Sequence, residues 1–127
     1  KKDRVEDAIY ATKAALKEGI VSGGGVALLN ASQQCNCEGP GEELFCKAIQ
    51  APFYTVLKNA GISDKEKVLE SLVTKGKGVD VVTGNHVDMV SAGIIDPVLV
   101  TKSALKNAAS VVSTIISADC IISNVRE

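Results

Sequence analysis

Three consecutive glycines, Gly23, Gly24 and Gly25, are the feature of this sequence best suited to contact a phosphorylated ligand. Without a Cβ atom a glycine lets backbone N–H groups approach a ligand closely, and the start of a following helix favours anions. The triplet is neither a Walker loop, since Gly-Lys-Ser/Thr does not follow it, nor a complete Gly-x-Gly-x-x-Gly fingerprint. Close packing of helices would explain it equally well. A nucleotide-contacting turn and a tight structural turn both remain as interpretations.

Two aspartates, Asp7 and Asp96, lie in sequence contexts where a carboxylate could take part in catalysis or in helix capping. Asp7 lies in a segment with helical periodicity, and a carboxylate on a rigid helix can orient water for in-line attack on a phosphate. A residue near a helix start can also be a solvated carboxylate that the helix dipole favours. Asp96 precedes Pro97, and this pair predicts a helix start with the aspartate as cap and the proline at the first helical position.

The four cysteines lie at positions 35, 37, 46 and 120. Cys35 and Cys37 are too close in sequence to form an ordinary disulfide with each other. A zinc site would need Cys46, His86 or another group to complete four ligands, and the sequence has no second closely spaced pair. We therefore expect reduced thiols without a metal, as is usual inside cells.

The sequence around these residues predicts mainly helices. Apolar residues recur at helical spacing in residues 3–18, which end at Gly19, and a second helix is expected directly after the glycines. Residues 33–41 read as an exposed loop. A longer helix is predicted over residues 42–59, with Pro52 kinking it or dividing it in two.

The second half of the sequence predicts helices and a few short strands. Ser63-Asp64-Lys65-Glu66 is a capping-box pattern and predicts a short helix to about residue 73. Residues 79–82 and 86–90 read as a hairpin, and a helix is predicted from Asp96-Pro97 to about residue 117. Residues 120–125 have the composition of a strand, but no partner for it is evident in the chain.

Composition limits the class of protein. Apolar residues make up 46% of the 127 residues while aromatics make up only 3%, so the core must consist of aliphatic side chains, which is typical of packed helices. The formal net charge of -1, spread along the chain, argues against nucleic acid as a partner. The chain contains no apolar run long enough to span a bilayer and no secretory signal at its start, so we expect no membrane association.

Motifs along almost the whole chain resemble those of the group I chaperonins, the GroEL type, in order and spacing. They are Lys-Lys-Asp-Arg-Val-Glu-Asp-Ala at 1–8, Ala-Thr-Lys-Ala-Ala at 11–15, Glu-Gly-Ile-Val at 18–21, Gly-Gly-Gly-Val-Ala-Leu at 23–28, Ala-Pro at 51–52, Lys-Asn-Ala-Gly at 58–61, Gly-Ile-Ile-Asp-Pro at 93–97 and Val-Thr-Lys-Ser-Ala-Leu at 100–105. Each motif alone is weak, but their combination is specific.

The resemblance implies a mainly α fold: the carboxy-terminal half of an equatorial domain, with a helical bundle, a small β-hairpin and a C-terminal strand, preceded by an intermediate-domain helix. On this basis residues 1–19 are the last helix of the intermediate domain. Residues 20–127 are then the second half of the equatorial, ATP-binding domain.

The resemblance also implies roles for individual residues. Asp7 matches the aspartate that acts on the water attacking the terminal phosphate of ATP, with Gly19 as a domain hinge. Gly24 matches the glycine that contacts nucleotide, and Asp96 the aspartate that contacts the nucleoside. Residues Asp80, Val81 and Val82 align with the stretch lining the base pocket, although Val79 stands where the family usually has tyrosine.

Other parts of the family's machinery are expected outside this sequence. The Gly-Asp-Gly-Thr-Thr-Thr phosphate loop, which supplies a magnesium ligand, belongs to the amino-terminal part of the subunit, as does the other half of the equatorial domain. The apical domain, which binds non-native polypeptides and the co-chaperonin, is also expected elsewhere. The resemblance thus implies an ATPase that uses ATP and Mg²⁺ in homo-oligomeric, seven-membered rings, with this chain alone inactive.

Alternatives remain for both function and location. The chain could be a helical scaffold without catalysis, or an unrelated nucleotide-dependent enzyme using its glycine turn. Lys-Lys-Asp-Arg-Val and Gly-Ile-Ile-Asp-Pro look more like mitochondrial members, and no Gly-Gly-Met tail, common in bacterial members, is present. We expect the mitochondrial matrix or a related organelle, with bacterial cytoplasm as the alternative.

Overall fold

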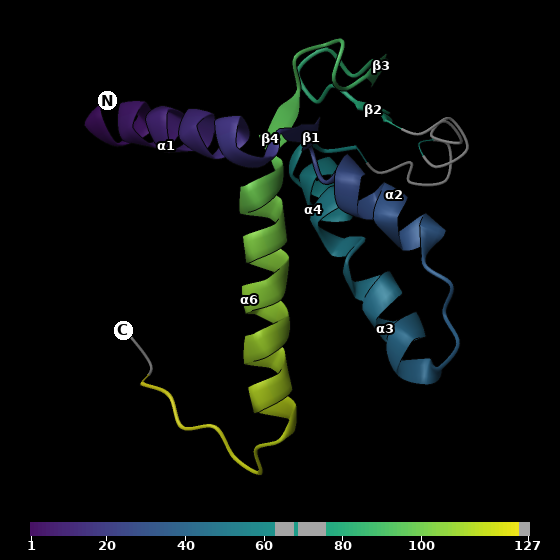
Figure 1. Ribbon diagram of the computed structural model, residues 1–127. Helices are drawn as coiled ribbons and strands as arrows, with labels where there is room; N and C mark the ends of the chain where they lie inside the picture. Colours follow the sequence, from purple (N-terminus) through teal and green to yellow (C-terminus); the bar gives the residue numbers. More distant parts are fainter. Residues whose placement is uncertain (63–67, 69–75, 125–127) are drawn as a thin grey trace.

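The computed structural model describes residues 1–62, 68 and 76–124, and its fold is mainly α, as the sequence predicts. The described helices are α1, α2, α3, α4 and α6, and two short two-stranded ribbons join them. Helices α2 and α4 lie together beside the β2–β3 ribbon, whereas α1 and α6 extend away from the β1–β4 ribbon in different directions (Figure 1). The helix predicted from the capping box at 63–66 lies outside the described residues.

Helix α1 (Lys2–Glu18) confirms the first predicted helix, and Gly19 ends it. Gly19 has φ +87°, which favours glycine, and its N–H donates to the carbonyl of Ala15 at 2.8 Å. Ala14 is the one buried residue of this helix, so α1 presents most of its surface to solvent.

Strand β1 (Ile20–Ser22) pairs in antiparallel fashion with β4 (Ile95–Pro97), and this ribbon was not predicted. It corrects the expected helix start, because α6 (Val98–Ile116) begins two residues after Asp96 with Pro97 as its N-cap. Asp96 belongs to the ladder and lies opposite Val21, so it does not cap the helix as predicted. The first N–H of α6, from Val98, donates instead to the carbonyl of Gly19 at 3.1 Å.

Prolines set the boundaries of the next helices. Helix α2 (Val26–Gln34) follows the glycines, and α3 (Pro40–Ala48) begins at a proline, where no hydrogen bond is lost. The predicted loop is therefore shorter than residues 33–41. Helix α4 (Ala51–Asn59) carries Pro52 in its first turn, so the predicted division of the long helix at this proline is confirmed.

The hairpin is present, but its strands are β2 (Lys77–Val79) and β3 (His86–Asp88), shifted from the predicted ranges. Asp80, Val81 and Val82 lie in the connecting turn and not in a strand. The reason is local, because the side chain of Asp80 accepts hydrogen bonds from within that turn.

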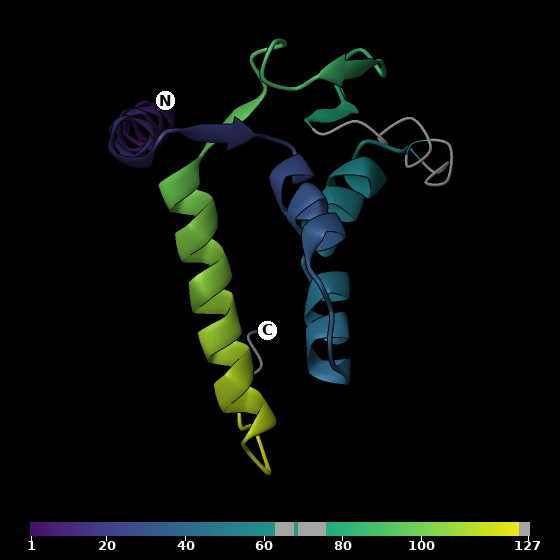
Figure 2. The same cartoon turned by 45° about the vertical axis from the view of Figure 1, so that its right-hand side comes forward.

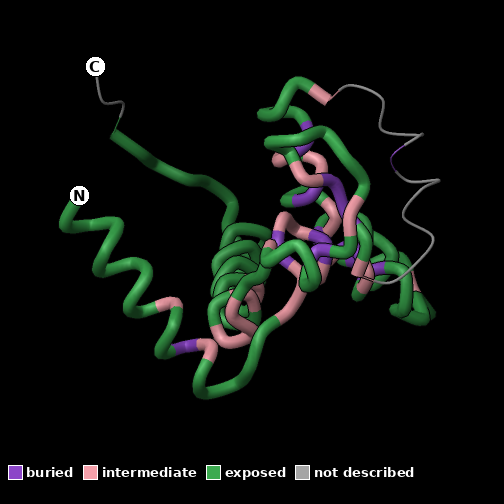
Figure 3. Tube along the Cα trace, turned by 90° about the horizontal axis from the view of Figure 1, so that it is seen from above, coloured by how far each residue is buried: buried purple, intermediate pink, exposed green. Residues whose placement is uncertain are grey.

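The core lies between α2, α4 and the hairpin (Figure 3). Its buried members are aliphatic apart from one phenylalanine and one methionine: Val26, Leu29, Phe53, Leu57, Val68, Val79 and Met89. Burial of such side chains is the main stabilising term in folding. Because α1 and α6 contribute nothing to this cluster, the core holds only one side of the molecule together.

Helix α6 has no buried residue, although its sequence is largely apolar. It stands apart from α3 and α4, as both Figure 1 and Figure 2 show. An apolar groove of about 820 Å³ separates them, lined on one wall by Leu44, Phe45 and Ala48 and on the other by side chains of α6 such as Leu105 and Val112. In a packed interior apolar side chains are covered by their neighbours. The face of α6 that lines the groove is therefore uncovered in this structure.

After α6 the chain has a turn at Ser117 and a bend at Asp119, and it continues to Asn124 exposed and without regular secondary structure, with Ile122 at 93% exposure. The predicted terminal strand is thus not formed over residues 120–124, and 125–127 lie outside the described residues. Among the described helices none combines the length and apolarity that a bilayer crossing requires.

Candidate nucleotide-contact site

The β1–β4 ribbon brings two predicted site regions together although they are far apart in the sequence. Val21 pairs with Asp96 and Ser22 with Ile95, and the N–H of Gly23 extends the ladder by donating to the carbonyl of Ile94 at 2.9 Å. The glycine turn therefore begins directly beside the aspartate. Gly25, Ser22 and Asp96 all line one end of the groove.

The conformation of the glycine turn explains part of the motif. Gly24 and Gly25 have φ of +64° and +79°, in the left-handed region that favours glycine. A Cβ atom on Gly25 would lie 2.6 Å from the backbone nitrogen of Phe53, so α2 and α4 meet through this residue. A Cβ atom on Gly24 would lie 3.0 Å from the flexible end of Met89. Tight packing accounts for Gly25, whereas Gly24 is less constrained.

Asp96 is the charged residue among those that line the groove. Partial burial raises the pKa of its carboxyl group above the ordinary value of 3.8, because desolvation disfavours the charged form. It lies where β4 turns into α6, so the ribbon fixes its backbone on one side and the helix on the other. A carboxylate so placed can accept hydrogen bonds from a ligand at the groove mouth.

The turn that holds Asp80, Val81 and Val82 is a separate place in the molecule. Both carboxylate oxygens of Asp80 accept hydrogen bonds within the turn, Oδ1 from the N–H of Val82 and Oδ2 from the hydroxyl of Thr83, each at 2.9 Å. These bonds lower the pKa of Asp80. None of the three residues is among those lining the groove, and Val82 is 90% exposed. The geometry therefore gives Asp80 a role in shaping its own turn.

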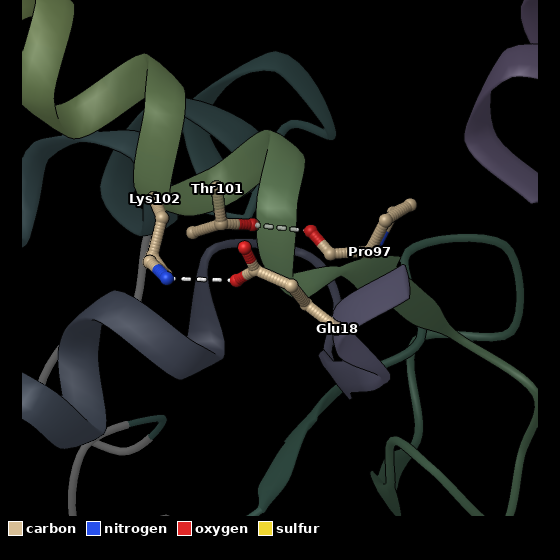
Figure 4. A network of polar contacts seen from close by, with 4 residues as sticks. All are labelled: Glu18, Pro97, Thr101 and Lys102. Atoms are coloured by element: carbon tan, nitrogen blue, oxygen red, sulfur yellow. Dashed lines mark hydrogen bonds and ion pairs between the residues drawn. The ribbon is translucent and has the colours of Figure 1, made fainter. Parts of the chain in front are cut away.

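Asp7 is exposed on α1, whose other end carries the connections to the site. Near that end the ammonium group of Lys102 contacts the carboxylate of Glu18 at 2.7 Å, which joins α1 to the first turns of α6 (Figure 4). In the same network the hydroxyl of Thr101 donates to the carbonyl of Pro97 at 3.4 Å. Helix α1 extends away from the β1–β4 ribbon (Figure 1), so in this conformation Asp7, in the first half of the helix, lies apart from Gly24 and Asp96.

Metal ligands do not cluster in the part of the chain that the structure describes: no group of three or more His, Cys, Asp or Glu side chains is arranged to hold an ion. The four cysteines are free thiols. Sequence reasoning missed the contact between Cys37 and Cys46, whose sulfur atoms lie 3.1 Å apart. It also missed the groove, although the apolar stripe of residues 98–115 was visible in the sequence.

The arrangement of helices and ribbons belongs to a known class of protein. Residues 1–126 match the TCP-1/cpn60 chaperonin family, and the chain is therefore a member of that family. The predicted class, a chaperonin, is thus confirmed.

A solved structure supports the same conclusion. The chain is similar to a group III chaperonin crystallised in the open state, with a TM-score of 0.76 and 29% sequence identity. The match covers 86% of this chain and 25% of that chaperonin, so the chain spans about a quarter of its length.

Proposed function

We propose that this chain is the carboxy-terminal part of a group I chaperonin subunit that uses ATP to assist the folding of non-native polypeptides. The observation that carries the proposal is the β1–β4 ribbon, which holds the start of the glycine turn beside Asp96, with Gly25 and Asp96 both lining one groove and Gly24 outside its lining. A glycine turn at the start of a helix, with a neighbouring carboxylate, suits a ligand carrying both phosphates and hydroxyl groups.

Each site residue has its own task in this proposal. Gly24 contacts nucleotide through its backbone, and Asp96 accepts a hydrogen bond from the nucleoside. Asp7 orients the attacking water after α1 moves about Gly19, whose φ of +87° and open surroundings leave room for a change of direction. In this proposal Asp80, Val81 and Val82 line the base pocket, and the hydrogen bonds that Asp80 accepts from Val82 and Thr83 hold their turn in shape.

The division into domains follows from the same proposal. Residues 1–19 belong to the intermediate domain and residues 20–127 to the equatorial domain, with the connection at Gly19. The other half of the equatorial domain covers the apolar face of α6, because a groove of about 820 Å³ lined by aliphatic side chains is unstable in water. Mg²⁺ neutralises phosphate charge when bound, and its ligand belongs to the phosphate loop outside these residues.

The remaining expectations concern the assembled protein. We propose homo-oligomeric, seven-membered rings, with co-chaperonin and unfolded polypeptides bound through an apical domain. The proposed location is the mitochondrial matrix or a related organelle, with bacterial cytoplasm as the alternative. The residues in support are the motifs at 1–5 and 93–97.

A comparison of the chain with the complete subunit tests this function. ATP binding and hydrolysis are measured for both, in preparations free of host chaperonin and with and without Mg²⁺. The proposal predicts Mg²⁺-dependent turnover by the complete subunit and only background turnover by the 127-residue chain, since the phosphate loop is absent. Tight binding and turnover by the chain alone would instead identify an independent nucleotide enzyme. If neither protein binds or hydrolyses ATP, the alternative of a helical scaffold without catalysis is favoured.

A further inference from the structure

Three of the four thiols gather where the loop after α2 meets α3. Cys37 lies in the loop and Cys46 near the end of the helix, and their sulfur atoms share a hydrogen bond at 3.1 Å. Cys46 is buried, with 8% of its surface exposed, whereas Cys35 and Cys37 are exposed. A hollow of about 400 Å³ lined in part by Cys35 and Cys46 opens beside them. Small molecules in solution can therefore reach the cluster.

We propose that Cys37 and Cys46 form a reversible disulfide by exchange with a small-molecule disulfide such as oxidised glutathione, while Cys35 stays free. A disulfide requires sulfur atoms about 2.05 Å apart, so the two thiols must approach by only about 1 Å. Cys37 can make this movement because it lies in an exposed loop, outside any helix or strand. Cys35 and Cys37 are too close in sequence to be the favoured pair.

The order of the exchange follows from exposure and charge. A hydrogen bond with Cys37, burial and the nearby Cys35 raise the pKa of Cys46 to about 12, so Cys46 stays protonated at first. The thiolate of exposed Cys37 attacks one sulfur of the glutathione disulfide, and the S–S bond breaks with release of one glutathione thiolate. The mixed disulfide removes the Cys37 thiol from its hydrogen bond with Cys46, which favours ionisation of Cys46.

The second exchange completes the modification. Cys46 transfers its proton to a released glutathione thiolate or to water and attacks the sulfur of Cys37, expelling the second glutathione. Two cysteine thiols are thereby oxidised, and one glutathione disulfide is reduced to two thiols. Because Gly41 and Phe45 line both the thiol hollow and the apolar groove, the new bond would tie the loop to α3 at the wall of the groove.

Peptide mapping of the complete subunit tests the proposal. The protein is treated with oxidised glutathione, its free thiols are alkylated, and it is digested with trypsin and a glutamate-specific protease. Cleavage after Glu38 and Glu43 separates Cys37 from Cys46, so a disulfide appears as a cross-linked peptide pair that dithiothreitol dissolves. Cys120→Ser is the matched control, since Cys120 is an exposed thiol outside the cluster.

The expected cross-link persists in Cys35→Ser and Cys120→Ser and falls at least about tenfold in Cys37→Ser. Cys37 is exposed, so circular dichroism should show that Cys37→Ser is folded. Three outcomes would each overturn the proposal: a cross-link that needs Cys35, a stable glutathione adduct on Cys37 without a cross-link, or full alkylation of both thiols after the treatment.

Discussion

At Gly25 the chain has no room for a side chain. Its φ of +79° is left-handed, and a Cβ atom would lie 2.6 Å from the backbone nitrogen of Phe53. We predict that Gly25→Ala destabilises the fold by about 2 to 5 kcal/mol, the sum of left-handed backbone strain and overpacking between α2 and α4. Urea denaturation followed by circular dichroism measures the change.

Gly84→Ala is the matched control, because Gly84 has φ +73° but nothing within 4 Å of a Cβ atom. Backbone strain alone should cost about 1 to 2 kcal/mol there. Equal losses of stability for the two substitutions would show that the contact with Phe53 adds nothing to the cost of a side chain at Gly25.

Asp80 offers a residue-scale test by pH. Its hydrogen bonds lower its pKa below the ordinary value of 3.8 in the folded chain, so its contribution to stability is complete above that value. The contribution is lost as pH falls through the folded pKa. We predict that Asp80→Ala lowers the urea midpoint at neutral pH and that the difference from wild type shrinks in acid. Asp80→Asn, which keeps an acceptor without the charge, should show a weaker pH dependence, and a gap that is constant with pH would contradict this account.

The sequence predicted the local structure at a site residue only where the motif matched the backbone conformation that the fold requires there. The glycine turn is where the motif predicted it, because left-handed φ values require glycine. Asp96 was assigned a capping role from its neighbour Pro97, but pairing with Val21 places it in a strand. The contact between Cys37 and Cys46 was not predictable from spacing, since it depends on the path of a loop.

At the scale of elements, helices were predictable and ribbons much less so. Periodicity identified α1 and α6, and Pro52 marked the break before α4. Strands β1 and β4 are three residues each and are separated by most of the chain, so no local pattern reveals their pairing. The hairpin ranges shifted because the side chain of Asp80 favours a turn.

The face of α6 that lines the groove is uncovered in this chain, and this leads to a prediction about the stability of a substitution on it. Val112 lines the groove and is 50% exposed in this chain. Val112→Lys should therefore change the stability of the 127-residue chain by less than about 0.5 kcal/mol. In the complete subunit it should cost about 3 to 5 kcal/mol, as for an unpaired charge that is buried when the rest of the domain covers the groove.

Ser113→Lys is the control for this test, because Ser113 is exposed on the same helix and does not line the groove. It should be tolerated in both proteins. A complete subunit that tolerates Val112→Lys as well would mean that this face of α6 stays in solvent.

For the whole molecule, the exposed terminal segment leads to a prediction about assembly. Ile121 and Ile122 are 64% and 93% exposed, and residues 120–124 form no strand within the chain. We predict that this segment pairs with a neighbouring subunit, so that the isolated chain self-associates and Ile122→Lys reduces the association. Sedimentation measures both proteins, and a monodisperse wild-type monomer with that segment paired internally would refute the prediction.

The extended arrangement of α1 and α6 could not be anticipated from the sequence. Both helices expose apolar residues, and among the described residues the core cluster consists of Val68 and side chains of α2, α4 and the hairpin region. Sequence patterns indicate which apolar side chains are expected to be buried. They do not indicate whether the residues that cover these side chains belong to the same chain.

The proposal that Asp7 orients the attacking water for ATP hydrolysis is tested by Asp7→Ala in the complete subunit. The control is Asp3→Ala, an exposed aspartate one helical turn earlier on α1. Equilibrium nucleotide binding and single-turnover hydrolysis at saturating ATP are measured for both variants. We expect nearly unchanged binding and hydrolysis slowed about 10²- to 10⁴-fold for Asp7→Ala, with Asp3→Ala close to wild type. Normal hydrolysis by Asp7→Ala would rule out this role for Asp7.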